Sequence, residues 1–192
     1  MLYRKVRCSM LFFLCVSVFV ILYLSVSLFF SGGIRKTIPN FPTHSYCLFY
    51  TDQKTADRIE GVIYSKVLTS NKYNIHGKPD YIFKSKRRNR YIPVELKSGS
   101  IGEKSLPNEG DLMQLIAYFL IIEDVYAAKV PEGRLIYSDA MFIIRNKKSV
   151  RRRFLKQLDR MRSMLHTGRE KVKPGFAHCR HCVCRETVCE FI

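Results

Sequence analysis

The sequence is short of acidic residues, and it contains neither an internal repeat nor a low-complexity tract, which excludes a repeat architecture. Its 192 residues are enough for one domain with a hydrophobic core. Only 16 Asp and Glu stand against 33 Lys and Arg, which gives a net charge of +17. Such a basic chain favours a polyanionic partner, either nucleic acid or an anionic membrane surface. A basic surface that only confers solubility is the alternative.

Charge is also missing between Met10 and Phe30, an apolar run of 21 residues. As a helix this run would span roughly 31 Å, about the thickness of a bilayer core. It is longer than the apolar region of about 7–15 residues in a cleaved signal peptide. The sequence therefore predicts an uncleaved transmembrane anchor in residues 1–34, crossing the membrane at residues 10–30. Cations flank the run on both sides, so the positive-inside rule does not fix its orientation.

Two carboxylates and a lysine lie in neighbouring segments that are typical of β-strands. Asp80 belongs to "GKPDYIFK", and Glu95 and Lys97 belong to "RYIPVELK". The polar residues 85–90 between them suit a hairpin loop. If the hairpin is centred between residues 87 and 88, Asp80 lies opposite Glu95, with Cβ atoms roughly 5 Å apart. Glu95 and Lys97 share one face because they are two residues apart.

This arrangement is suited to metal-dependent phosphodiester hydrolysis. Asp80, Glu95 and the backbone carbonyl of Leu96 are oxygen ligands of the kind that Mg²⁺ or Mn²⁺ takes. The ion would polarise a phosphate and lower the pKa of an attacking water. Lys97 would orient that water or neutralise charge that builds up on the phosphate. An exposed hairpin with an ordinary Glu–Lys pair is the alternative.

A helix is predicted from about Glu109 to Tyr126, with Asn108 as its N-cap. Gln114 and Tyr118 are four residues apart and share one face, where they could contact phosphate, water or a base. Two strands in residues 133–146 and a basic helix ending at Gly168 follow. This order predicts an α/β fold with a mixed β-sheet flanked by helices, occupying residues 45–170 after a linker at 35–44.

Residues 171–192 form a tail that is rich in cysteine. Its cysteines are Cys179, Cys182, Cys184 and Cys189, and Cys47 stands alone in the domain. Four thiolates suit Zn²⁺ or an iron–sulfur cluster equally well on spacing. Bound metal would supply the folding energy of such a short segment. Unligated reduced thiols are the alternative.

Together these motifs resemble the PD-(D/E)XK nuclease superfamily. The likeness is to the RecB-like exonucleases associated with CRISPR systems and to the nuclease domain of the eukaryotic replication helicase-nuclease. It runs from about residue 73 to residue 189 and rests on "GKPDYIF", "IPVELKSG", "QLIAY" and a C-terminal Cys-x2-Cys-x6-Cys. The resemblance implies a restriction-endonuclease-like core that cleaves DNA, single-stranded or with free ends, and a [4Fe–4S] cluster.

Carried over to this sequence, the resemblance implies a set of functional residues. Asp80 and Glu95 would bind the metal, Lys97 would be catalytic, and Gln114 and Tyr118 would support it. The cluster ligands would be Cys47, Cys179, Cys182 and Cys189, with Cys184 as the alternative to Cys47.

The sequence thus predicts a membrane-anchored DNA nuclease whose catalytic domain lies in the cytoplasm. One alternative is a nuclease-like protein at the membrane that binds DNA without cleaving it and carries structural zinc or an iron–sulfur site. Another is a membrane protein whose basic face binds anionic lipid.

Overall fold

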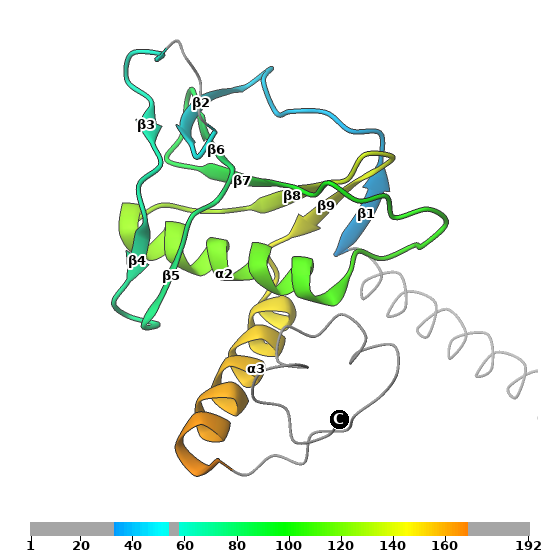
Figure 1. Ribbon diagram of the computed structural model, residues 1–192. Coiled ribbons are helices and arrows are strands. Elements are labelled where there is room, and N and C mark those ends of the chain that lie inside the picture. Colours follow the sequence, from blue (N-terminus) through cyan, green and yellow to red (C-terminus); the bar gives the residue numbers. More distant parts are fainter. Residues whose placement is uncertain (1–32, 54–57, 169–192) are drawn as a thin grey trace, which may run out of the picture. The chain divides into compact units, whose positions relative to one another are not determined.

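The computed structural model describes residues 33–53 and 58–168 (Figure 1). The strands are β1 (Ile34–Thr37), β2 (Tyr46–Thr51), β3 (Ile63–Tyr64), β4 (Leu68–Ser70), β5 (Ile75–Gly77), β6 (Tyr81–Ser85), β7 (Tyr91–Leu96), β8 (Glu132–Ile136) and β9 (Met141–Arg145). The helices are α2 (Glu109–Tyr126) and α3 (Lys148–Thr167). The chain divides into two compact units between Phe154 and Leu155, and the first unit contains both sheets and α2.

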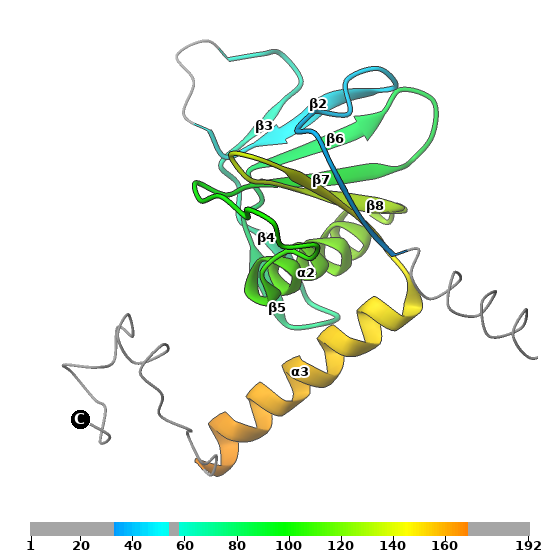
Figure 2. The same cartoon turned by 90° about the vertical axis from the view of Figure 1, so that its right-hand side faces the viewer.

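Seven strands form one mixed sheet in the order β1-β9-β8-β7-β6-β2-β3. Among these strands, β7–β8 and β2–β3 are parallel pairs and the other neighbours are antiparallel. Strands β4 and β5 form a separate two-stranded sheet. The helix α2 connects the parallel strands β7 and β8 and lies against one face of the large sheet (Figures 1 and 2). This crossover brings α2 next to the hairpin that carries the candidate site.

The register of the β6–β7 hairpin is the one that the sequence predicts. Tyr81 pairs with Val94 and Lys84 pairs with Tyr91, so the hairpin is centred between residues 87 and 88. Side chains alternate between the two faces of a strand, so Glu95 points to the side of α2, while Ile92 and Val94 point to the opposite side.

The helix α2 is buried on almost all sides because it lies between two layers. It contacts β7 and β8 of the large sheet and also the β4–β5 hairpin. Its buried side chains are Leu112, Leu115, Ile116, Tyr118, Phe119, Leu120, Ile121 and Ile122. Helices that are apolar all round are found in such buried positions. The spacing of Leu112, Leu115, Ile116 and Phe119 predicts one apolar stripe on this helix. The β4–β5 layer explains why more of the helix is covered.

The face of the sheet opposite α2 holds an aromatic and aliphatic cluster. Phe83, Ile92 and Val94 are its buried members. The ring of Phe41, from the segment that follows β1, packs against Tyr81 and Phe83, with ring centroids 5.5 and 5.7 Å apart. The curled sheet and this segment therefore cover the cluster, and no second helix is needed on that face.

The structure corrects the predicted fold class. The sequence predicts an α/β core with helices flanking the sheet, preceded by a transmembrane helix. The described residues instead form a curled, mostly antiparallel mixed sheet of seven strands with only two helices. Neither helix has the length and hydrophobicity that crossing a bilayer requires. The apolar run at residues 10–30 lies outside the described residues.

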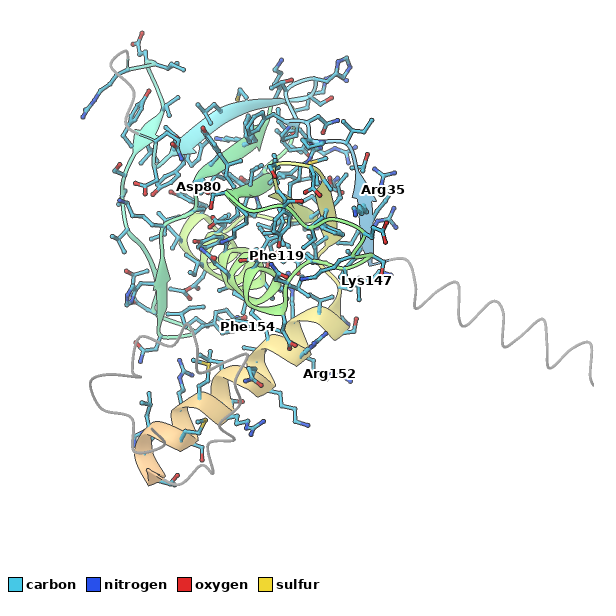
Figure 3. All side chains as sticks on the ribbon, turned by 45° about the vertical axis from the view of Figure 1, so that its right-hand side comes forward. Arg35, Asp80, Phe119, Lys147, Arg152 and Phe154 are labelled. Atoms are coloured by element: carbon cyan, nitrogen blue, oxygen red, sulfur yellow. The ribbon has the colours of Figure 1, made fainter. Side chains whose placement is uncertain are left out.

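Other elements differ from the prediction in instructive ways. The strand β1 forms in the segment expected to be a linker and pairs with β9. The limits of α2 are confirmed, but the side chain of Asn108 donates to the carboxylate of Asp111 and makes no cap hydrogen bond to the backbone. The helical spacing of Phe154, Met161 and Leu165 predicts a buried apolar stripe on α3. Phe154 (labelled in Figure 3) is buried, whereas Met161 is 53% exposed and Leu165 is 87% exposed.

Gly133 in β8 allows α2 to lie close to the sheet. A Cβ atom at this position would lie 2.5 Å from Cε1 of Phe119 and 3.0 Å from Cδ1 of Leu115. We expect Gly133→Ala to destabilise the fold by about 1–3 kcal/mol, because overpacking forces the core side chains to shift. Chemical denaturation measures this loss as a lower midpoint at an unchanged slope.

The matched control is Gly110→Ala in the first turn of α2. A Cβ atom there has no neighbour within 4 Å. This variant should be neutral or stabilised by up to about 1 kcal/mol, because alanine favours helix. Equal stabilities of the two variants would contradict the close contact between β8 and α2.

Candidate active site

Asp80 and Glu95 lie at the end of the β6–β7 hairpin away from its loop. Asp80 directly precedes β6, and its Oδ2 atom accepts a hydrogen bond of 2.7 Å from the backbone N–H of Leu96. The side chain of Gln53 lies 3.4 Å from the other oxygen of Asp80. Glu95 is only 6% exposed, which is unusual for a carboxylate. Strand β7 thus carries Glu95 inside the domain, and its backbone N–H at Leu96 holds the side chain of Asp80 in place.

Lys97 lies at the centre of a polar network. Its Nζ atom is 3.1 Å from Oε1 of Glu95, 2.7 Å from Oε1 of Gln114 and 3.3 Å from Oδ1 of Asp111. The amide of Gln114 also donates to Oε1 of Glu95 at 2.7 Å. Three of the residues singled out from the sequence, Glu95, Lys97 and Gln114, are therefore in direct contact.

Tyr118 extends this network along α2. Its hydroxyl accepts from the amide of Gln114 at 2.8 Å and lies 3.2 Å from the carbonyl oxygen of Lys78, to which it donates. The chain next to Lys78 passes close to this ring. A Cβ atom on Gly77 would be 2.8 Å from Cε1 of Tyr118, so the glycine of the "GKPD" motif makes room for the tyrosine.

Two functional neighbours were missed by the sequence analysis. Asp111, in the first turn of α2, forms an ion pair with Lys97. The hydroxyl of Tyr137, which follows β8, donates to Oδ2 of Asp111 at 2.6 Å. Asp111 lies three residues before Gln114, on the same face of α2. That spacing was a signal that could have revealed it.

The electrostatics of the network depend on burial. Burial raises the pKa of Glu95 above its usual 4.5, the negative charge of Asp80 raises it further, and Lys97 offsets part of the effect. Burial by itself would lower the pKa of Lys97, but hydrogen bonds and charges from Glu95 and Asp111 outweigh it and raise that pKa. Burial also raises the pKa of Tyr118 to about 12. Lys97 is therefore held as a cation and Tyr118 as a neutral hydroxyl.

The donor set at this site fits a hard divalent cation. The Oε2 atom of Glu95 is buried and has no hydrogen-bond partner among the described residues. A buried carboxylate oxygen without a partner is costly, and a cation would compensate it. Within residues 33–53 and 58–168 there is no group of three or more His, Cys, Asp or Glu that could hold a metal. The protein would thus offer two carboxylates, and backbone oxygen and water would complete the shell.

The predicted iron–sulfur ligands fall largely outside the described residues. Cys179, Cys182, Cys184 and Cys189 all lie there, as does the whole of the predicted tail at 171–192. Cys47 is exposed in β2, with its Sγ atom 3.5 Å from the carbonyl oxygen of Lys84. A cluster or zinc site, the carbonyl ligand from Leu96 and the location in the cytoplasm stay predictions.

The raised pKa of Glu95 makes the stability of the metal-free protein depend on pH. Because the folded-state pKa lies above the unfolded value, the stability that Glu95 contributes is complete below pH 4.5 and is lost as the pH rises through the folded pKa. We therefore expect Glu95→Gln to raise the unfolding temperature at pH 7 in EDTA, and the gain to vanish as the pH falls toward 4.5.

Thermal unfolding across this pH range provides the measurement. Glu103→Gln removes the same charge from an exposed loop and is the control. A Glu95→Gln variant that is less stable than the wild type at pH 7 would show that the buried carboxylate does not destabilise the metal-free fold.

Comparison with known proteins adds little to this geometry. No family model matches the chain, and no curated protein matches it. One similar solved structure is the crystal structure of SSO0001, with 19% sequence identity and a TM-score of 0.40. The match covers 88% of this chain and 67% of that chain. A likeness of this size decides neither the fold nor the function.

Proposed function

We propose that this domain is a Mg²⁺- or Mn²⁺-dependent phosphodiesterase that acts on DNA. The observation that carries the proposal is Glu95, a buried carboxylate that bonds Lys97 through one oxygen and has no partner for the other among the described residues. The charge of Asp80 acts on this same group. Perturbed carboxylates with a specific charged partner are typical of functional sites.

Each residue of the network has a distinct task in this proposal. Asp80 and Glu95 would hold the metal ion, which supplies Lewis-acid polarisation of the phosphodiester. Lys97 places a positive charge beside Glu95, where charge on the reacting phosphate would be stabilised. The side chain of Lys97 is 20% exposed, so it is not fully closed off from solvent.

Residues on α2 position these groups. Gln114 bonds both Glu95 and Lys97 and so fixes the separation between the acid and the ammonium. Asp111 also pairs with Lys97, and together with the larger effect of Glu95 it raises the pKa of that ammonium group. Tyr118 fixes the amide of Gln114 and links it to the backbone of Lys78. A site held from two elements in this way is preorganised, which is what electrostatic stabilisation of a transition state requires.

The excess of cations supports DNA as the substrate. The sequence carries 33 Lys and Arg against 16 Asp and Glu. A polyanion would be attracted to this surface at long range. The resemblance to PD-(D/E)XK exonucleases supports DNA that is single-stranded or has free ends.

A second candidate function is nucleic-acid binding without cleavage. It is favoured by the small donor set, because among the described residues no third acidic or histidine side chain joins Asp80 and Glu95. A weak metal site would leave a basic domain that binds DNA but does not cut it.

Hydrolysis assays with the full chain test the proposal. We expect Glu95→Gln and Asp80→Asn to abolish Mn²⁺-dependent cleavage of single-stranded DNA, because each removes a ligand. Lys97→Ala should lower the rate by about 10²–10³-fold, which is typical for loss of one electrostatic stabiliser.

Glu103→Gln is the matched control and should cleave like the wild type. Wild-type rates in Glu95→Gln would reject the site. Binding of DNA by a wild-type protein that shows no cleavage in Mn²⁺ or Mg²⁺ would support the second candidate function instead.

A further inference from the structure

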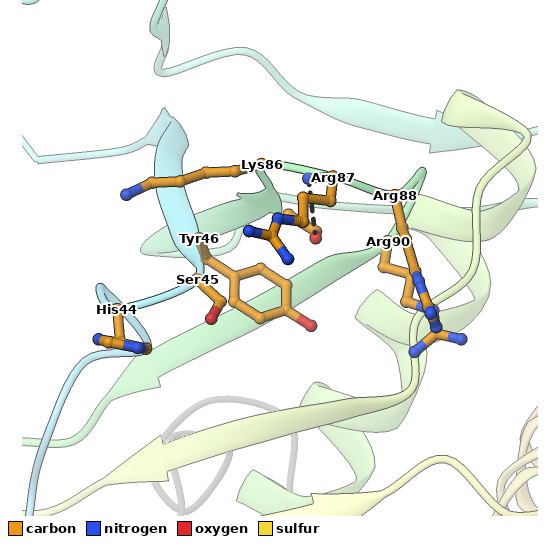
Figure 4. A pocket seen from close by; sticks show the side chains of 8 residues that line it. His44, Ser45, Tyr46, Lys86, Arg87, Arg88 and Arg90 are labelled. Atoms are coloured by element: carbon orange, nitrogen blue, oxygen red, sulfur yellow. Dashed lines mark hydrogen bonds between the residues drawn. The ribbon is translucent and has the colours of Figure 1, made fainter.

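A recessed pocket lies at the other end of the β6–β7 hairpin, around its loop. It has a volume of about 500 Å³ and is lined by residues 44–46, 85–88 and 90 (Figure 4). Four of the lining side chains are cations, Lys86, Arg87, Arg88 and Arg90, and none is acidic. Within the described ranges, no carboxylate forms an ion pair with any of these four cations. The pocket is therefore strongly positive.

Hydrogen bonds to neighbouring segments of backbone hold the loop that carries these cations. The N–H of Lys86 donates to the carbonyl of Ser45 at 3.1 Å, and the N–H of Ser85 donates to the carbonyl of Arg90 at 2.8 Å. The side-chain amide of Asn89 donates to the backbone carbonyl of Ala127 at 3.2 Å. A loop held in this way places its charges before a ligand arrives, which lowers the entropic cost of binding.

The pocket is separate from the candidate active site. Asp80 directly precedes β6 and Ser85 is its last residue, so the two lie about 17 Å apart at roughly 3.3 Å per residue. The two sites also lie on different faces. Tyr46, which lines the pocket, packs against the cluster of Phe83, Ile92 and Val94 on the face opposite α2. None of the pocket's cations contacts Glu95 or Lys97 through a hydrogen bond.

We propose that this pocket binds the phosphates of a nucleic-acid strand, as an anchoring site outside the catalytic centre. A phosphate recurs at every nucleotide of a strand, and several cations on one loop suit a ligand with such repeated charge. Arginine binds phosphate through two parallel N–H groups, and the ring of Tyr46 offers a surface for a base. The choice of a polynucleotide as the ligand rests on the proposed function. That the ligand is an anion follows from the cations that line the pocket and is independent of that function.

Binding of a single-stranded DNA oligonucleotide to the full chain in EDTA tests the pocket without cleavage. Arg87→Gln combined with Arg88→Gln removes two exposed charges and leaves the backbone bonds of the loop in place. We expect the dissociation constant to rise about tenfold or more, as for loss of two charge-assisted bonds. The slope of log K against log salt should fall in magnitude by about 1.4 for a single strand.

The matched control is Arg145→Gln combined with Arg152→Gln, two exposed arginines outside the pocket. Weaker binding in the pocket variant than in this control supports the proposal, and equal binding overturns it. If the pocket variant instead loses binding to phosphatidylserine vesicles while its DNA binding equals the control, the pocket is a lipid headgroup site and the proposal is wrong. Cleavage of DNA by the wild type in Mn²⁺ is measured separately from binding in EDTA. A wrong proposed function and a wrong assignment of the pocket therefore give different results.

Discussion

The register of the β6–β7 hairpin is the constraint on which the rest of the domain depends. Side chains alternate along β7, so Glu95 faces α2 while Ile92 and Val94 enter the cluster on the other face. A slip by one residue would exchange the two sets, moving the carboxylate into the apolar cluster and the aliphatic side chains toward the polar network. Burial of Ile92 and Val94 therefore fixes the position of Glu95, and core packing and the candidate chemistry share one cause.

The helix α2 combines a structural and a chemical role. Its apolar residues fill the space between the large sheet and the β4–β5 hairpin, and this packing holds the helix firmly. Asp111, Gln114 and Tyr118 interrupt the apolar surface, and their polar atoms contact Lys97, Glu95 or Lys78. Because these groups are partly buried, the network satisfies most of their hydrogen bonds, and one oxygen of Glu95 remains for a ligand. A buried oxygen without a hydrogen-bond partner lowers the stability of the fold, and proteins commonly retain such destabilising groups at functional sites.

The same hairpin separates charge of opposite sign. Two acids lie at its open end, and four cations lie at its loop, on the opposite face of the sheet. A bound polynucleotide would find attraction at the loop and would need a metal ion to approach the acids. This separation explains how a chain that is strongly basic overall can still carry a local pair of acids.

Local patterns in the sequence were sufficient for the hairpin, its register, the limits of α2 and the meeting of Glu95 with Lys97, because strand alternation and helical spacing act over a few residues. The fold class was wrong. Whether a sheet needs a second helix depends on what covers its other face, and here Phe41 and the curl of the sheet do so. The edge strand β1, the second layer over α2 and the ion pair of Asp111 with Lys97 likewise join segments far apart in the chain. Such contacts were decided only by the tertiary structure, because their energy comes from burial between distant segments and leaves no local pattern in the sequence.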